Sequence, residues 1–204
     1  MIRLYHAAFS TNSERVRLAL AYKGLEAESV LIEYSDRTLV QQVSGQGLVP
    51  VLEEDGVVVH DSHAILRHLE ERHPDAPLFP PGPAQQAELD VFLEWFDHVW
   101  KIAPNAIEAE LGNTPPDAGR IEELSGDMQR HLDLFEQLLT GRDHLLGDSL
   151  TAADLVAFPF LKYARPDEAE DDELFHVVLD EHQSLGGRPR LAAWIERVDA
   201  LPRA

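Results

Sequence analysis

A proline-rich segment divides the chain into two parts with different sequence patterns. The stretch from Pro74 to Pro83 (PDAPLFPPGP) contains five prolines and one glycine. Because proline can continue neither an α-helix nor a central β-strand, this stretch predicts a linker between two domains. We expect a first domain over residues 1–76, a linker over residues 77–83 and a second domain over residues 84–204.

The first part alternates strand and helix signals. Short apolar runs predict strands, and Asp55-Gly56 between two of them is a strong signal for a β-hairpin, since both residues tolerate positive φ. Helix signals follow the polar stretch Ser10–Ser13 and begin again near Ser62, which we expect to cap the third helix. The predicted order is β-α-β-α-β-β-α, with elements near 2–6, 15–23, 29–33, 38–43, 49–52, 57–59 and 62–73.

The second part has a helical period of 3.6 residues throughout, which predicts an all-α domain. Thr151 and Asp154 have the spacing of a helix capping box. Three amphipathic faces recur, consisting of Leu89, Phe92, Leu93, Phe96, Trp100 and Ala103, then Ile121, Leu124, Met128, Leu132, Phe135 and Leu139, then Leu191, Trp194, Ile195 and Val198. We interpret Arg165–Glu173 (RPDEAEDDE) as a solvated charged loop.

Composition excludes several classes of function. The chain has no cysteine, so a thiol used in its chemistry must arrive with a ligand. Its 17 basic and 37 acidic side chains give a net charge of −20, which disfavours nucleic acid and anionic membranes as partners. No apolar run approaches the length of a membrane span, and the first residues do not resemble a signal peptide. We expect a cytoplasmic protein.

Two short segments have residues suited to binding an amino-acid-like ligand. An X-Pro bond at Val49-Pro50 can be cis, leaving the Val49 backbone to pair with an extended ligand. Asp61-Ser62 precedes a predicted helix, whose free N–H groups favour a carboxylate while Asp61 could meet an ammonium group. The Ser10 hydroxyl follows the first strand and could stabilise a bound thiolate. Helix capping alone would also explain Ser10, Asp61 and Ser62.

The whole chain resembles the glutathione transferase superfamily. Five segments carry the resemblance in the right order, namely Ser10-x-x-Ser13-x-Arg15-Val16-Arg17, Val49-Pro50-Val51-Leu52, Asp61-Ser62-x-Ala64-Ile65, the proline linker, and Thr151-x-Ala153-Asp154. The segment Pro189-Arg190-Leu191-x-x-Trp194 near the end of the chain is also familiar in that family. The resemblance implies a thioredoxin-like α/β domain followed by an all-helical domain. It also implies assembly as a homodimer, which we carry over as an expectation.

The resemblance also implies roles for single residues. Ser10 matches the serine that activates the glutathione thiol, Pro50 the cis-proline, and Val49 the residue that pairs with the cysteinyl backbone. Asp61 and Ser62 match the pair that holds the γ-glutamyl group. Leu48 stands where a basic or amide residue usually contacts the glycyl carboxylate, and Ser44-Gly45 stands where the family often has Asn-Pro. Gln46 or Arg37 is the expected substitute contact.

Other candidate residues follow from the same reasoning. Phe9, Phe96, Trp100 and Asn105 are candidates for the electrophile pocket, although a core role comes first for the aromatic residues of the helix. Tyr5 lies within a strand, where packing is its expected role. His60 with His63, and His68 with His73, lack a metal-binding motif such as HExxH, so we predict no metal site.

We therefore predict an enzyme that binds reduced glutathione as co-substrate and directs its thiolate at a small hydrophobic electrophile. Two alternatives remain at this stage. One is a non-catalytic binding or regulatory protein of the same fold. The other is an isomerase or another thiol-dependent enzyme of this fold.

Overall fold

The computed structural model describes residues 1–165, 171 and 173–204, so much of the predicted charged loop Arg165–Glu173 lies outside the described residues. The chain divides into two compact units, described separately below. The first unit comprises Met1–Phe79 together with Ala200–Ala204, and the second comprises Pro80–Asp199. The change from one unit to the other falls within the predicted linker. The sequence pattern had placed the last five residues with the helical domain, but the Ala204 amide donates to the Arg17 carbonyl.

The first unit has the predicted β-α-β-α-β-β-α order. Its four strands form one sheet in the order β2-β1-β3-β4. β1 and β2 are parallel, whereas β3 is antiparallel to both β1 and β4. The elements are β1 (Ile2–His6), α1 (Thr11–Tyr22), β2 (Ala27–Leu31), α2 (Thr38–Ser44), β3 (Val51–Glu54), β4 (Val57–His60) and α3 (Ser62–Arg72). This is the thioredoxin-like arrangement expected from the sequence.

The hairpin between β3 and β4 forms as predicted. Asp55 and Gly56 have φ values of 52° and 83°, which are the positive values that a primed hairpin turn requires. The second strand, in contrast, begins at Ala27, two residues before the apolar run that predicted it. Parallel pairing with β1, from Ile2–Ala27 to His6–Leu31, determines these bounds, so polar residues such as Glu28 belong to this edge strand.

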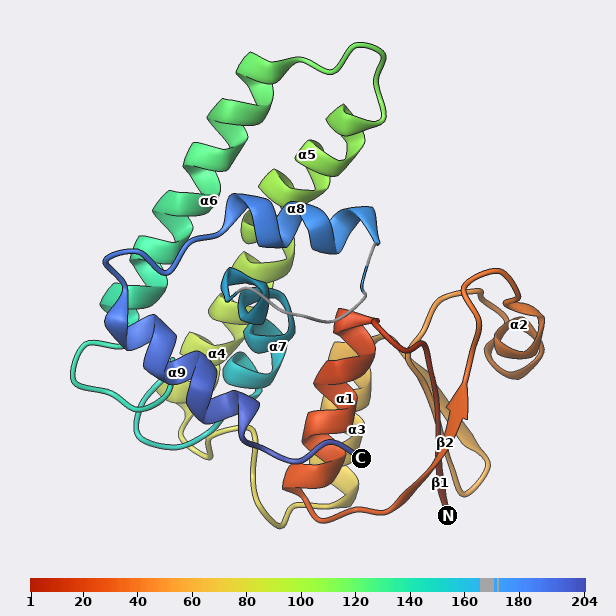
Figure 1. Cartoon of the computed structure of the whole chain (residues 1–204). Helices are drawn as coiled ribbons and strands as arrows, with labels where there is room; N and C mark the ends of the chain where they lie inside the picture. Colours follow the sequence, from red (N-terminus) through yellow and green to blue (C-terminus); the bar gives the residue numbers. More distant parts are fainter. Residues whose placement is uncertain (166–170, 172) are drawn as a thin grey trace. The chain divides into compact units, whose positions relative to one another are not determined.

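Helices α1 and α3 run side by side in the same direction (Figure 1). Near their N-termini, Arg15 Nη1 donates to Ser62 Oγ over 3.1 Å. At their other ends, Lys23 Nζ donates to Glu70 Oε2 over 2.7 Å. The two contacts require that the helices be parallel, with both N-termini at one end of the first unit.

The regular elements of the second unit, among its described residues, are all helices. Its elements are α4 (Pro83–Trp95), the π-helical turn η1 (Phe96–Trp100), α5 (Ile102–Leu111), α6 (Ala118–Leu138), α7 (Ala152–Leu161), the 3₁₀ turn η2 (Lys162–Ala164), α8 (Leu174–His182) and α9 (Pro189–Asp199). Every residue of α7 is buried, which makes it the central helix of this unit. Helix α8 was not predicted from the sequence.

The predicted apolar face of the first long helix is buried in full, but the helix is not a single regular one. A π-helical turn separates α4 from α5 at Phe96–Trp100. Within that turn the rings of Phe96 and Trp100 stack, with centroids 4.5 Å apart. Among the described residues, no helix has both the length and the apolar character needed to cross a bilayer.

The predicted capping box at the start of α7 is present. The Asp154 carboxylate accepts hydrogen bonds from the Thr151 amide and hydroxyl, the Leu145 amide and the Trp194 indole. Asp154 itself has no exposed surface. One buried carboxylate thus connects α7, α9 and the loop before α7, and this role is structural.

Candidate functional site

Ser10 lies between β1 and α1 and is the N-cap of α1. Its Oγ accepts a hydrogen bond from the Ser13 amide over 3.2 Å, and its own amide donates to the Ala7 carbonyl over 3.3 Å. Because the hydroxyl oxygen is used as the cap acceptor, the hydroxyl proton is available for donation to a second group. The capping role and the donor role that the sequence left as alternatives are therefore compatible in one side chain.

Tyr5, the other hydroxyl considered near the first strand, is directed elsewhere. It is 4% exposed, and its hydroxyl donates to Glu53 Oε2 over 3.0 Å. Tyr5 also belongs to a hydrophobic cluster with Ile32, Val40 and Val51. It therefore serves the packing of the sheet, as the sequence indicated.

Arg15 provides a buried positive charge beside the start of α3. The side chain is 1% exposed, and its Nη1 lies 3.1 Å from Ser62 Oγ and 3.3 Å from His63 Nε2. The N-termini of α1 and α3 are close together as a result, and each helix terminus adds about half a positive charge. In a chain with a net charge of −20, this corner of the first unit is a local environment that favours an anion.

Asp61, and not Ser62, caps α3, which corrects the expectation for this helix. Asp61 Oδ1 accepts hydrogen bonds from the amides of His63 and Ala64 over 2.9 and 3.1 Å. Ser62 is the first helical residue and is 5% exposed beneath Arg15. Asp61 has a φ of 74°, an uncommon backbone conformation for a residue with a side chain. Such conformations gather at ligand-binding positions, where the surrounding structure maintains them.

The Val49-Pro50 peptide bond is cis, which the sequence had allowed for an X-Pro bond at this position. Val49 precedes β3, and the pairing of β3 with β1 begins only at Val51 opposite Tyr5. Among the described residues, the Val49 backbone makes no backbone–backbone hydrogen bond outside the regular elements. Its N–H and C=O groups are therefore suited to pair with an extended ligand.

The two candidates for a carboxylate contact, Gln46 and Arg37, differ in their surroundings. The Gln46 amide nitrogen donates to Ser44 Oγ and to the Leu48 carbonyl, so this side chain supports its own loop. The Arg37 guanidinium lies 4.7 Å above the Tyr34 ring, and its Nη1 is buried without a hydrogen-bond partner among the described residues. A buried N–H of this kind gains most from an added acceptor.

The aromatic candidates for an electrophile pocket fall into two groups. Phe9 is 45% exposed, next to Ser10. Phe96 and Trp100 are 0% and 1% exposed, and both rings pack against Phe160 in the core of the second unit. The structure thus places these two rings in the helical core. Asn105 is exposed on α5.

The histidines at the end of α3 pair with a carboxylate. His68 Nε2 and His73 Nε2 lie 2.8 and 2.7 Å from the two oxygens of Glu54, which is 3% exposed. Burial acts to raise the pKa of Glu54, but the hydrogen bonds from His73 and His68 and the nearby charge of Arg72 outweigh it. The pKa of Glu54 is therefore lowered. This cluster stabilises the β3–β4 hairpin against α3, and no local sequence pattern predicts it.

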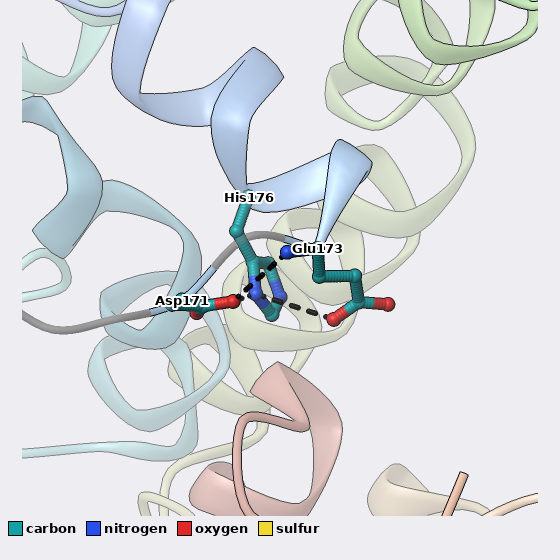
Figure 2. Close-up of side chains that lie close together, drawn as sticks. All are labelled: Asp171, Glu173 and His176. Atoms are coloured by element: carbon teal, nitrogen blue, oxygen red, sulfur yellow. Dashed lines mark hydrogen bonds and ion pairs between the residues drawn. The ribbon is translucent and has the colours of Figure 1, made fainter. Parts of the chain in front are cut away.

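One group of described residues has ligand atoms spaced closely enough for a metal ion, namely Asp171, Glu173 and His176. Figure 2 shows the imidazole between the two carboxyl groups, with Nδ1 2.7 Å from Asp171 and 3.2 Å from Glu173. Tyr163 donates a further hydrogen bond to Asp171. Glu173 is the N-cap of α8 and His176 lies in its first turn, so we assign these contacts to the start of that helix.

A thioredoxin-like unit with a serine at the N-cap of α1 and an acidic-Ser pair at α3, followed along the chain by a helical unit, defines the glutathione transferase class of fold. Comparison with known families agrees. The N-terminal domain of glutathione S-transferases matches residues 4–77, and the C-terminal domain matches residues 118–197. The chain belongs to the glutathione S-transferase superfamily.

Relatives of the chain carry different names. FtsZ-localized protein A of Caulobacter vibrioides is 30% identical over 166 residues, covering 76% of this chain and 73% of that protein. Glutathione S-transferase 3 of Zea mays is 28% identical over 216 residues, covering 98% and 90%. The crystal structure of a glutathione S-transferase from Rhodospirillum rubrum F11 is similar with a TM-score of 0.76 and 30% identity, covering 99% and 89%.

Proposed function

We propose that this protein is a glutathione transferase, which lowers the pKa of the glutathione thiol and directs the thiolate at a small hydrophobic electrophile. The observation that carries the proposal is the Ser10 hydroxyl. It is fixed as the cap of α1 by the Ser13 amide, and its proton is available to a bound sulfur atom. Family membership supports glutathione as the thiol.

The energy required is within reach of this site. Lowering a thiol pKa from about 8.5 to ~6.5 requires a preferential stabilisation of the thiolate by roughly 2.7 kcal/mol. A hydrogen bond to a charged acceptor contributes about 1.5–3 kcal/mol, and a nearby helix N-terminus contributes up to about 1 kcal/mol more. Ser10 at the N-terminus of α1 combines both contributions.

The tripeptide would be held by groups of the first unit. The γ-glutamyl carboxylate is assigned to the N-terminus of α3 and Ser62, and its ammonium group to Asp61, whose Oδ1 already caps the helix. The cysteinyl backbone is assigned to Val49 and Pro50. Arg37 is preferred over Gln46 for the glycyl carboxylate, because its Nη1 is buried and still lacks an acceptor.

The electrophile would contact Phe9, whose ring is exposed beside Ser10, with Asn105 as a further candidate. We also propose a homodimer. Val91, Val99 and Ile102 are 69%, 42% and 58% exposed along α4, η1 and the start of α5. Apolar side chains gathered along one helical segment are characteristic of a surface that is covered by a partner. Cytoplasmic detoxification chemistry fits this proposal.

The relative named for its localisation with FtsZ supports a second role for this fold, which is binding another protein without catalysis. The two roles differ in one observable property. A transferase must turn over an electrophile, whereas a binding protein need not.

The test is steady-state conjugation of glutathione to an activated aryl chloride, measured across a range of pH. We expect kcat/KM to follow the ionisation of a thiol with a lowered pKa. In Ser10→Ala we expect kcat/KM to fall by about 25-fold near pH 7, because a return of the thiol pKa from ~6.5 to about 8.5 lowers the thiolate fraction by that factor. Tyr5→Phe is the matched hydroxyl control and should retain activity. Unchanged activity in Ser10→Ala, or loss of activity in Tyr5→Phe instead, would refute the assignment of Ser10.

A further inference from the structure

A cavity open to solvent lies on the surface of the helical unit, and none of its lining residues is assigned to glutathione or to the electrophile. It has a volume of about 360 Å³, within the usual size range of small-molecule sites. Its walls come from the loop that follows α6 and from α9. The lining residues are Leu139, Gly141, Arg142, Asp143, Asp148, Arg190, Ala193 and Arg197.

The helical wall of this cavity has a regular arrangement. Arg190, Ala193 and Arg197 follow the i, i+3, i+7 spacing and therefore lie on one face of α9. The small side chain of Ala193 leaves room between the two arginines. Gly141 and Arg142 in the loop after α6 complete the lining beside this face.

Two of the three arginines are held in place by the protein. Arg190 Nε lies 3.0 Å from the Glu136 carbonyl and 3.1 Å from Glu136 Oε1. Arg197 donates from Nη1 to the Asp143 carbonyl, and its Nη2 lies 3.4 Å from Asp143 Oδ1. Since Arg190 uses Nε for these contacts, its two terminal nitrogens are available as further donors. An oriented guanidinium loses less conformational entropy when it binds a ligand.

The other two charged groups that line the cavity are Arg142 and Asp148. Arg142 and Asp148 take part in no side-chain hydrogen bond or ion pair among the residues that the structure describes. Three arginines against two aspartates give the lining a net positive charge, in a chain whose net charge is −20. Guanidinium groups match the geometry of phosphate oxygens, and an isolated carboxylate accepts from a ligand hydroxyl.

We propose that this cavity binds a small phosphate ester that carries free hydroxyl groups. The phosphate would contact Arg142 and the terminal nitrogens of Arg190, and a hydroxyl would donate to Asp148. This site is independent of the proposed glutathione chemistry, since all of its residues belong to the second unit.

The test is calorimetric titration of the full chain, at low ionic strength in a phosphate-free buffer, with glycerol phosphate, inorganic phosphate and glycerol as probes. We expect saturable binding of glycerol phosphate, weaker binding of inorganic phosphate and none of glycerol. Arg142→Gln should weaken glycerol phosphate binding at least tenfold. Arg120→Gln is the matched control, because it removes the same charge from an exposed position of α6 outside the cavity, and should change the affinity less than twofold.

Asp148→Asn tests the hydroxyl contact separately. It should weaken glycerol phosphate while leaving inorganic phosphate equal or tighter, since a negative charge is removed. No saturable binding at millimolar concentration would overturn the proposal, as would equal losses in Arg142→Gln and Arg120→Gln. The assignment to a phosphate ester would be overturned if glycerol phosphate bound no more tightly than inorganic phosphate and Asp148→Asn had no effect.

Discussion

Lys23 connects the ends of α1 and α3, and its replacement by methionine tests the parallel packing of these helices. The ammonium group is fully buried and donates to Glu70 Oε2 over 2.7 Å. It also contacts the carbonyl oxygens of His73, Asp75 and Ala76 over 2.9, 3.3 and 3.1 Å. Methionine has nearly the same shape, so Lys23→Met removes the charge and its donors while preserving most of the packing.

The expected cost is large because Glu70, whose side chain is only 20% exposed, would keep its charge without the buried ammonium group beside it. Removing one member of a buried ion pair costs about 3–5 kcal/mol, since the other charge is left uncompensated. For a chain of this length, each kcal/mol lowers Tm by about 2–4 °C, so Lys23→Met should lower Tm by roughly 10 °C. The additional change Glu70→Gln removes the stranded charge and should restore about 1 kcal/mol or more.

The assay is urea unfolding followed by circular dichroism, with tryptophan fluorescence recorded in parallel. All three tryptophans, Trp95, Trp100 and Trp194, belong to the second unit, so fluorescence alone would not report on Lys23 directly. Arg130→Met is the control. It breaks an exposed pair with Asp127 and should cost at most about 1 kcal/mol. A cost of Lys23→Met as small as that of the control would refute the reasoning.

Three further outcomes are expected. Asp154→Asn places an amide NH₂ group against N–H groups that now donate to the buried carboxylate, so it should lower the free energy of unfolding in urea by about 3 kcal/mol. Asp180→Asn, on the exposed face of α8, is the control and should lower it by less than about 0.5 kcal/mol. Burial and the charge of Arg17 lower the pKa of His6 below 6.5 in the folded protein. As the pH decreases through about 6.5, the unfolded chain therefore binds a proton at His6 before the folded protein does, and the free energy of unfolding decreases. His6→Gln should therefore lose less stability than the unaltered chain between about pH 8 and pH 5.5. Arg37→Gln should weaken glutathione binding about tenfold by calorimetry, and an unchanged affinity would exclude this contact.

Local patterns in the sequence were sufficient to predict most of the fold. Three of these features depend on residues within four positions of one another. They are the order of the first seven elements, the primed turn at Asp55-Gly56 and the capping box at Thr151–Asp154. The cap at Ser10 is local in the same sense. Such features are visible in a sequence because the chain itself places the partners together.

Features that depend on distant partners could not be predicted. Arg15 meets Ser62 across 47 positions, and Lys23 meets Glu70 across 47 positions as well. A lysine or arginine in an amphipathic helix is ordinarily solvated, so burial of these two is a result of tertiary packing. The proposal of Arg37 over Gln46 likewise depends on the structure, because only the contacts of the loop show that the Gln46 amide is already used.

Helix α8 was missed for a different reason. Leu174–His182 is a short segment directly after a run of acidic residues, and that run indicated a loop. Its apolar residues Val178 and Leu179 are fully buried in the helical unit. Isolated helices of this length are marginal in water, and packing supplies what intrinsic propensity does not.

The central claim is that Ser10 stabilises a glutathione thiolate. The most direct test is the ultraviolet thiolate absorbance of glutathione titrated against the protein at mildly acidic pH, for the unaltered chain, Ser10→Ala and Tyr5→Phe. We predict a saturable thiolate signal in the unaltered chain and in Tyr5→Phe, and its loss in Ser10→Ala although glutathione still binds. An equal signal in Ser10→Ala, or no binding of glutathione to the unaltered chain, would contradict the claim.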